Sequence, residues 1–136
     1  MIIDTSALIA ILRDEEGRES IRDALLVEGG IIPTPVVVEL RRVTARTGNQ
    51  LHPDASDLLI QLQAERTTIE SFTADDADLA VAANAQYGTG NGRGGTLNML
   101  DLMVYGMGRR MERPILCTGK DFAATDIAIH RASRGW

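Results

Sequence analysis

The sequence lacks several features that would assign it to a class at once. A single cysteine, Cys117, excludes an internal disulfide framework and is typical of a reducing compartment. No stretch approaches the ~18 consecutive apolar residues of a membrane span. The first residues, MIID, do not form the basic segment that opens a secretory signal. Together these absences predict a cytoplasmic protein with no membrane association.

Features typical of nucleic-acid binders are also scarce. The formal net charge is −5 and the sequence pI is about 5.0, so there is no global basic field to attract RNA or DNA. Aromatic residues make up only 4% of the chain, which argues against recognition by base stacking. What remains is the composition of a globular domain that can bury a sizeable core, because 44% of its 136 residues are hydrophobic. We predict one domain over residues 1–136.

Short β-branched segments alternate with amphipathic segments along the chain. Strands are predicted at residues 1–3, 29–33, 67–71 and 114–117, and helices at residues 5–12, 15–26, 34–46, 54–66, 76–85 and 98–111. This alternation predicts an α/β fold, a three-layer α/β/α sandwich around a central, mainly parallel twisted sheet.

Capping residues mark the starts of three of these helices. Thr5 or Ser6 is expected to cap the first helix, and Thr34, which precedes a proline, is expected to cap the third. Thr73 and Asp76 have the spacing of a capping box.

Four acidic residues occupy positions where a carboxylate is costly or close to a ligand crevice. Asp4 directly follows the first strand, and Asp121 comes shortly after the strand at 114–117. In a parallel sheet the carboxyl ends of the strands border the ligand crevice. Glu39 shares a helix face with valines at i−3 and i+4, and Asp101 is flanked by leucines near the start of its helix.

Each acid alone has a structural explanation. Asp4, Asp101 or Asp121 could be a cap or turn residue, and Glu39 could pair with an arginine on its own helix. As a group they would repel one another if brought together without a cation. Hard oxygen ligands of this kind suit Mg²⁺, with Mn²⁺ as the alternative. A metal would then explain why Asp4 lies between two apolar segments.

Four segments resemble, in order and spacing, the sequence blocks of PIN-domain ribonucleases, in particular the VapC toxins of type II toxin–antitoxin pairs. They are MIIDTSALIAIL, PTPVVVELRRV, LNMLDLMVYG and PILCTGKDFAATDI, and the match spans nearly the whole chain. The resemblance implies that the family's catalytic and metal-binding acids are Asp4, Glu39, Asp101 and Asp121, with Asp126 at a further acidic position. Polar support for the metal site is implied at Thr5, Ser6, Asn98 and Thr118, where helix caps or turn hydroxyls are an equal alternative.

The resemblance also implies an activity and a set of partners. The expected reaction is Mg²⁺-dependent endoribonuclease cleavage, in which one or two ions activate a water that hydrolyses an RNA phosphodiester. The expected partners are an RNA substrate, a VapB-like antitoxin and a second copy of the chain, with a higher toxin–antitoxin assembly also open. Two alternatives remain at this stage: a non-catalytic α/β interaction module, or a metal-dependent DNA nuclease or phosphatase that uses the same carboxylates.

Other motifs give weaker signals. GNGRGG at 90–95 has the spacing of a dinucleotide-binding loop but follows a helix rather than a strand, so we predict a flexible loop. His52 and His130 lack zinc-site spacing and are predicted to lie at the surface. Basic residues cluster in three places, and these clusters could be solvated surface or could follow an RNA backbone. The clusters are Arg41, Arg42 and Arg46; Arg109, Arg110 and Arg113; and Lys120, Arg131 and Arg134.

Overall fold

A computed structural model of the chain describes residues 1–46 and 51–134. Within these ranges four strands and six helices follow one another in nearly regular alternation. They are β1 (Ile2–Ile3), α1 (Thr5–Leu12), α2 (Arg18–Glu28), β2 (Gly30–Pro33), α3 (Thr34–Thr44), α4 (Leu51–Ala64), β3 (Thr67–Glu70), α5 (Ala74–Tyr87), α6 (Met99–Met111) and β4 (Ile115–Leu116). None of these helices is long and apolar enough to cross a membrane.

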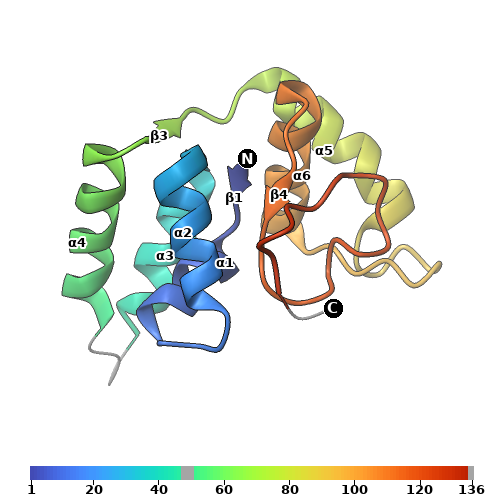
Figure 1. The fold of residues 1–136 in the computed structure, drawn as a ribbon. Helices are drawn as coiled ribbons and strands as arrows, with labels where there is room; N and C mark the ends of the chain where they lie inside the picture. Colours follow the sequence, from blue (N-terminus) through green and yellow to red (C-terminus); the bar gives the residue numbers. More distant parts are fainter. Residues whose placement is uncertain (47–50, 135–136) are drawn as a thin grey trace.

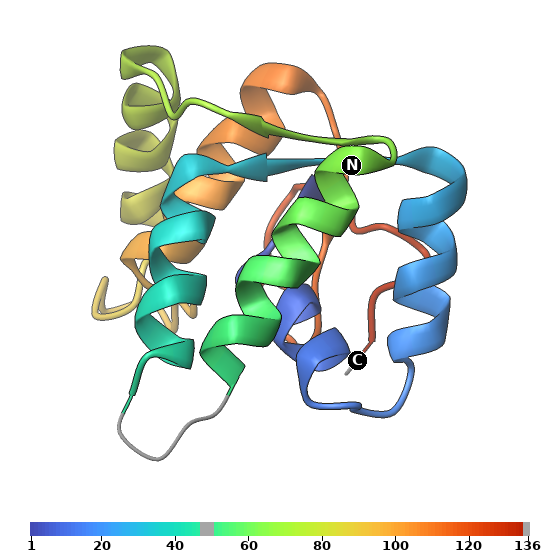
Figure 2. The ribbon, with the colours of Figure 1, turned by 90° about the vertical axis from the view of Figure 1, so that its left-hand side faces the viewer.

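The four strands form one parallel sheet in the order β3-β2-β1-β4. From β1 to β3 the chain moves in one direction across the sheet, through α1 to α4. It then returns through α5 and α6 and places β4 on the other side of β1. Because crossovers between parallel strands are right-handed, this reversal puts α5 and α6 on the face opposite α1 to α4. Figures 1 and 2 show these two helical layers with the strands between them, which confirms the predicted three-layer fold.

The central strands are buried from both sides, which explains their continuous apolar sequences. In β1 and β4 the side chains of Ile2, Ile3, Ile115 and Leu116 are fully buried, and Ile2 pairs with Ile115 while Ile3 pairs with Leu116. Each such side chain contributes about 2 kcal/mol through burial of apolar surface. This packing fixes the carboxyl ends of β1 and β4 next to each other.

A buried ion pair joins α5 to α6. The Asp76 carboxylate is fully buried; it accepts the Thr73 backbone N–H as part of the predicted capping box, and both Arg110 Nε and Nη2 donate to it. Burial alone would raise the pKa of Asp76, but the hydrogen bonds from Arg110 and Thr73 outweigh it and hold that pKa below its ordinary value. Gly106 lets the helices approach closely, since a Cβ there would lie 2.4 Å from the Asp76 carbonyl oxygen.

Several predicted helix boundaries were wrong for identifiable reasons. The second helix begins at Arg18 rather than residue 15, because Gly17 has a φ of +87° and cannot continue a right-handed helix. The fourth begins at Leu51 rather than residue 54. The first is capped by Asp4 and not by Thr5 or Ser6. In α3 the cap position is Pro33, and the Thr34 hydroxyl accepts a hydrogen bond from the Phe72 backbone N–H.

His130 is buried, so its predicted surface position was wrong. Its Nδ1 accepts from the Ala132 backbone N–H, and its Nε2 lies 3.1 Å from Glu28 Oε2. Arg131 donates to the other Glu28 oxygen. His130 and Arg131 therefore connect the segment after β4 to the end of α2. The side chain of His52 lies outside the described residues.

Breaking the link between α5 and α6 should destabilise the fold. Arg110→Gln leaves the Asp76 charge buried without its partner, at an expected cost of about 3 kcal/mol in the free energy of unfolding. Arg22, an exposed residue of α2, provides the matched control, and Arg22→Gln should change stability by less than about 0.5 kcal/mol. Urea unfolding of both variants beside the wild type measures the difference. Equal midpoints for the two variants would show that the ion pair contributes nothing to stability.

Candidate metal centre

Asp4 connects the end of β1 to the start of α1. Its backbone N–H donates to the Leu116 carbonyl at 2.9 Å, which continues the β1–β4 pairing, and its side chain is 6% exposed. Oδ2 of Asp4 caps α1 by accepting from the Ser6 backbone N–H at 2.9 Å and also accepts from the Ser6 hydroxyl. The short strand and the helix cap therefore fix this carboxylate at the carboxyl edge of the sheet.

Ser6 links Asp4 to the segment that follows β4. Its hydroxyl donates to Asp4 and accepts from the Thr118 backbone N–H at 2.9 Å. Thr118 thus supports the site through its main chain rather than through a hydroxyl contact. The Thr5 hydroxyl is buried and finds no hydrogen-bond partner in the described part of the chain. Of the predicted supporting residues, Ser6 makes the most direct contact with an acid.

Asp101 is held at the start of α6 by a capping box. The Asn98 side chain accepts from the backbone N–H groups of Leu100 and Asp101, and Oδ2 of Asp101 accepts from the Asn98 backbone N–H at 2.8 Å. Asp101 is only 8% exposed. Asn98 is therefore the cap of α6, which was the alternative to a role at the metal site, and its backbone N–H orients the Asp101 carboxylate.

Asp101 interacts electrostatically with each of the other three predicted acids. The pKa of Asp101 is raised to about 7: burial is the largest cause, the charges of Asp4, Asp121 and Glu39 add to it, and the Asn98 hydrogen bond opposes it. Burial also raises the pKa of Asp4; the hydrogen bonds from Ser6 oppose this rise and the Glu39 charge adds to it. The charges of neighbouring acids therefore add to the effect of burial at Asp4 and Asp101.

Glu39 and Asp121 are the less buried members of the group. Glu39 lies half-buried on α3, and Asp121 is exposed in the turn after β4. The Thr96 hydroxyl donates to the Asp121 backbone carbonyl at 2.6 Å, which attaches this turn to the segment before α6. The acids therefore come from four separate elements, two at the base of the site and two at its rim.

The four side chains offer the type of donor atom, carboxylate oxygen, that a hard divalent cation prefers. All four side chains are carboxylates, and their charges are mutually repulsive in the absence of an ion. In residues 1–46 and 54–134 no three acidic, histidine or cysteine side chains are close enough to enclose an ion as they stand. The acids would therefore have to approach one another when an ion binds.

Asp126 is paired with two residues of α6. The Tyr105 hydroxyl donates to its Oδ1 at 2.6 Å, and Arg109 Nη1 lies 3.3 Å from its Oδ2. The Tyr105 hydrogen bond and the Arg109 charge hold the pKa of Asp126 below its ordinary value despite partial burial. Burial and Asp126 in turn raise the pKa of Tyr105. Sequence reasoning missed both partners, although Tyr105 and Arg109 share a helix face through their four-residue spacing.

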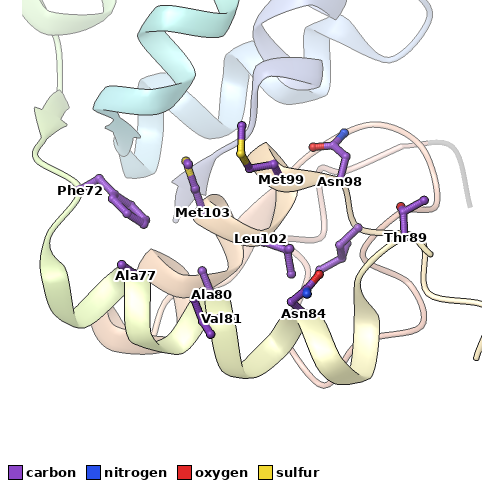
Figure 3. Close-up of a pocket in the computed structure, with 11 residues that line it drawn as sticks. Phe72, Ala77, Ala80, Val81, Asn84, Thr89, Asn98, Met99, Leu102 and Met103 are labelled. Carbon is purple, nitrogen blue, oxygen red and sulfur yellow. The ribbon is translucent and has the colours of Figure 1, made fainter. Parts of the chain in front are cut away.

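An apolar groove of about 430 Å³ lies between α5 and α6, and its lining includes Asn98, the cap of α6. Its lining residues are Phe72, Ala77, Ala80, Val81, Asn84, Thr89, Leu97, Asn98, Met99, Leu102 and Met103. Figure 3 shows Asn98, the cap of the helix that carries Asp101, at one end of this lining and Phe72 at the other. The four-residue spacing of Met99 and Met103 was the available sequence signal for this groove.

The parallel sheet between two helical layers, with acids at its carboxyl edge, defines the class. The chain belongs to the PIN-domain family, because the family model described as "PIN domain" matches residues 1–128, and within that family it is a member of the VapC ribonucleases. Ribonuclease VapC30 of Mycobacterium tuberculosis is 36% identical over 94% of this chain and 96% of the relative.

Solved structures agree with this assignment at the level of the fold. The crystal structure of M. tuberculosis VapC20, described as a sarcin-ricin loop cleaving toxin, has a TM-score of 0.73 at 16% identity and covers 96% of this chain and 98% of that one. VapBC2 from Rickettsia felis, bound to a DNA fragment from its promoter, has a TM-score of 0.73 at 12% identity and covers 99% of this chain and 97% of that one.

The raised pKa of Asp101 predicts a specific pH dependence of stability. Between the ordinary carboxyl value of 3.8 and about 7, the folded protein keeps a proton on Asp101 that the unfolded chain has released. Retention of this proton contributes to the free energy of unfolding. The contribution is fully present below the pKa of the unfolded chain and is lost as the pH rises through about 7. Asparagine does not ionise, so Asp101→Asn does not undergo this loss. The stability of the variant relative to wild type should therefore rise between about pH 5 and pH 8 in the presence of chelator.

Asp126→Asn is the control for this measurement. The pKa of Asp126 is lowered in the folded protein. Its ionised form therefore contributes to the free energy of unfolding above the pKa of the unfolded chain, and this contribution is lost only as the pH falls below that value. The difference between Asp126→Asn and wild type should therefore stay constant over the same range. Urea unfolding at intervals of one pH unit measures both differences, and a flat result for Asp101→Asn would contradict the raised pKa of Asp101.

Proposed function

We propose that this chain is a Mg²⁺-dependent endoribonuclease and the toxin of a type II toxin–antitoxin pair. The observation that supports this most strongly is the group of four carboxylates, Asp4, Glu39, Asp101 and Asp121, at the carboxyl edge of the sheet, with the pKa of Asp101 raised to about 7. Relatives that align over nearly the whole chain are named ribonuclease VapC. A structural neighbour, VapC20, is described as a sarcin-ricin loop cleaving toxin.

Asp4 and Asp101 are the principal residues that would hold the ion, with Glu39 and Asp121 completing its ligands. Bound Mg²⁺ lowers the pKa of a coordinated water and offsets charge on the scissile phosphate. The Ser6 hydroxyl and N–H orient the Asp4 carboxylate, and the Asn98 N–H orients that of Asp101. Because Asp101 holds a proton near neutral pH when no ion is bound, protons and metal compete for this site.

Asp4→Asn and Asp101→Asn should each lower RNA cleavage by several orders of magnitude. Each change removes one charged metal ligand at constant size, while asparagine retains an oxygen that can cap the helix. Added Mg²⁺ should raise the melting temperature of the wild type more than that of either variant, because ligand binding stabilises the state that binds. Asp126→Asn, whose carboxylate is engaged by Tyr105 and Arg109, should have a milder effect. Cleavage that survives both substitutions and chelator would overturn the metal site.

The choice of substrate distinguishes this proposal from its alternatives. Single-stranded RNA, single-stranded DNA and a phosphomonoester, each tested with Mg²⁺, separate a ribonuclease from a DNA nuclease and a phosphatase. We expect cleavage of RNA alone. A folded protein that cleaves none of the three would instead support a non-catalytic interaction module whose acids serve only as caps.

We also propose a VapB-like antitoxin as the partner. The groove between α5 and α6 offers apolar surface, with Val81 and Met99 each 74% exposed, and its lining includes Asn98, whose backbone N–H donates to Asp101. One partner segment can therefore bury apolar side chains in the groove and place a basic side chain against the acids. One structural neighbour is described as a toxin–antitoxin complex from Klebsiella pneumoniae. Another is described as VapBC2 bound to a DNA fragment from their promoter. Self-association into a homodimer stays a prediction.

Expression of the chain alone should arrest growth, and co-expression with its antitoxin should restore it. Val81→Asp places a charge in the groove, so it should weaken antitoxin binding and leave growth arrested despite co-expression. Ile60→Asp, on the exposed face of α4 and 66% exposed, is the matched control and should be neutralised normally. Sedimentation of each protein alone tests whether Val81 lies instead in a homodimer interface. Equal antitoxin affinity for the two variants would place the antitoxin elsewhere.

A further inference from the structure

The segment that connects α5 to α6, residues 88–97, is attached to two of the four acids, and we call it the glycine loop. The Thr96 hydroxyl donates to the Asp121 backbone carbonyl at 2.6 Å. The next residues lead through Asn98, which caps α6, to Asp101. Figure 1 shows this loop, in yellow-orange, projecting beside the C-terminal segment. Its position relative to the acidic centre is therefore set by hydrogen bonds at its base.

Hydrogen bonds also hold the shape of the loop itself. The Thr89 backbone N–H donates to the Leu97 carbonyl at 2.8 Å and closes the base. At the tip, the Asn91 side-chain oxygen accepts from the backbone N–H groups of Arg93 and Gly95 at 2.8 and 3.1 Å. A ligand can therefore bind this loop with little ordering cost.

Three alternate glycines present free backbone donors. Gly90, Gly92 and Gly94 are exposed, with φ of +81°, +73° and +78°, and nothing lies within 4 Å of where a Cβ would stand. Their N–H groups have no hydrogen-bond partner among residues 1–46 and 51–134. The glycines are required by backbone conformation, and the absence of side chains lets another molecule approach the main chain closely.

The loop also provides a positive charge that the rest of the protein does not use. Arg93 is exposed, and its guanidinium makes no hydrogen bond or ion pair within the described residues. No acid occurs between residues 88 and 98. Members of the predicted basic clusters, in contrast, hold the fold together, since Arg109, Arg110 and Arg131 each pair with an acid.

We propose that the glycine loop binds the phosphodiester backbone of the RNA substrate and places it on the acidic centre. The Arg93 guanidinium pairs with a phosphate, and the free glycine N–H groups donate to phosphate oxygens. Such an element answers a physical need, because a chain of net charge −5 with four clustered acids repels a polyanion. This inference rests on the proposed ribonuclease function and extends it to the positioning of the substrate.

Salt-dependent binding of a labelled single-stranded RNA tests the proposal. The measurement uses Asp101→Asn as the background, so that the RNA is not cleaved, with Arg93→Gln and Arg22→Gln added separately. Arg22 is exposed on α2 and makes no ion pair or hydrogen bond within the described residues, so both changes remove one exposed positive charge. Loss of one phosphate contact reduces the magnitude of the slope of log K against log salt by about 0.7. This corresponds to an affinity about fivefold weaker at 0.1 M salt. We expect this for Arg93→Gln and not for Arg22→Gln.

Cleavage kinetics in the otherwise wild-type protein separate binding from chemistry. Arg93→Gln should raise KM with kcat largely retained, and Arg93→Lys should recover part of the loss because it restores the charge without the planar fork. Equal salt slopes and equal KM for Arg93→Gln and Arg22→Gln would overturn the loop's role while leaving the ribonuclease intact. Weaker antitoxin binding with unchanged RNA binding would also overturn it. Failure of the wild type to cleave RNA would remove the proposed function and this inference together.

Discussion

Mutual repulsion among four carboxylates is the constraint on which this structure depends. Asp4 and Asp101 are almost fully buried, which raises the pKa of both; the charges of Asp4, Asp121 and Glu39 add to the rise at Asp101, and that of Glu39 adds to the rise at Asp4. A fold that keeps such groups together needs rigid supports that do not rely on the charges themselves. The parallel pairing of β1 with β4 supplies one such support, and the layer formed by α5 and α6 supplies the other.

Helix caps perform two tasks at this site. Oδ2 of Asp4 satisfies a free N–H at the start of α1, and Oδ2 of Asp101 satisfies the N–H of Asn98 before α6. These are bonds that helix termini need in any protein. Because each cap uses one carboxylate oxygen, the acid is held in place by ordinary secondary structure while it remains able to offer oxygen to a ligand. The helix N-termini also favour negative charge, which offsets part of the repulsion.

The sequence predicted the elements better than the contacts between them. The apolar strand segments, the capping box of Thr73 and Asp76, and the positions of Asp4 and Asp101 all follow from short-range patterns, and the structure bears them out. The burial of His130 and the pairing of Arg110 with Asp76 depend on elements far apart in the chain, so no local pattern reports them. Asp126 shows the same limit, because its partner Tyr105 is identified only when the last segment packs on α6.

The distribution of positive charge also follows from the repulsion among the acids. An arginine placed directly among the four carboxylates would neutralise them and occupy the position of a cation, so basic residues are useful only at a distance from the centre. Arg109 and Arg110 of α6 are consistent with this arrangement, because each pairs with an acid outside the group of four. A polyanionic substrate must nevertheless be attracted to the same edge of the sheet. Separate placement of negative charge in the buried caps and positive charge on an exposed loop meets both requirements, because the charges of the loop are solvated and do not neutralise the buried acids.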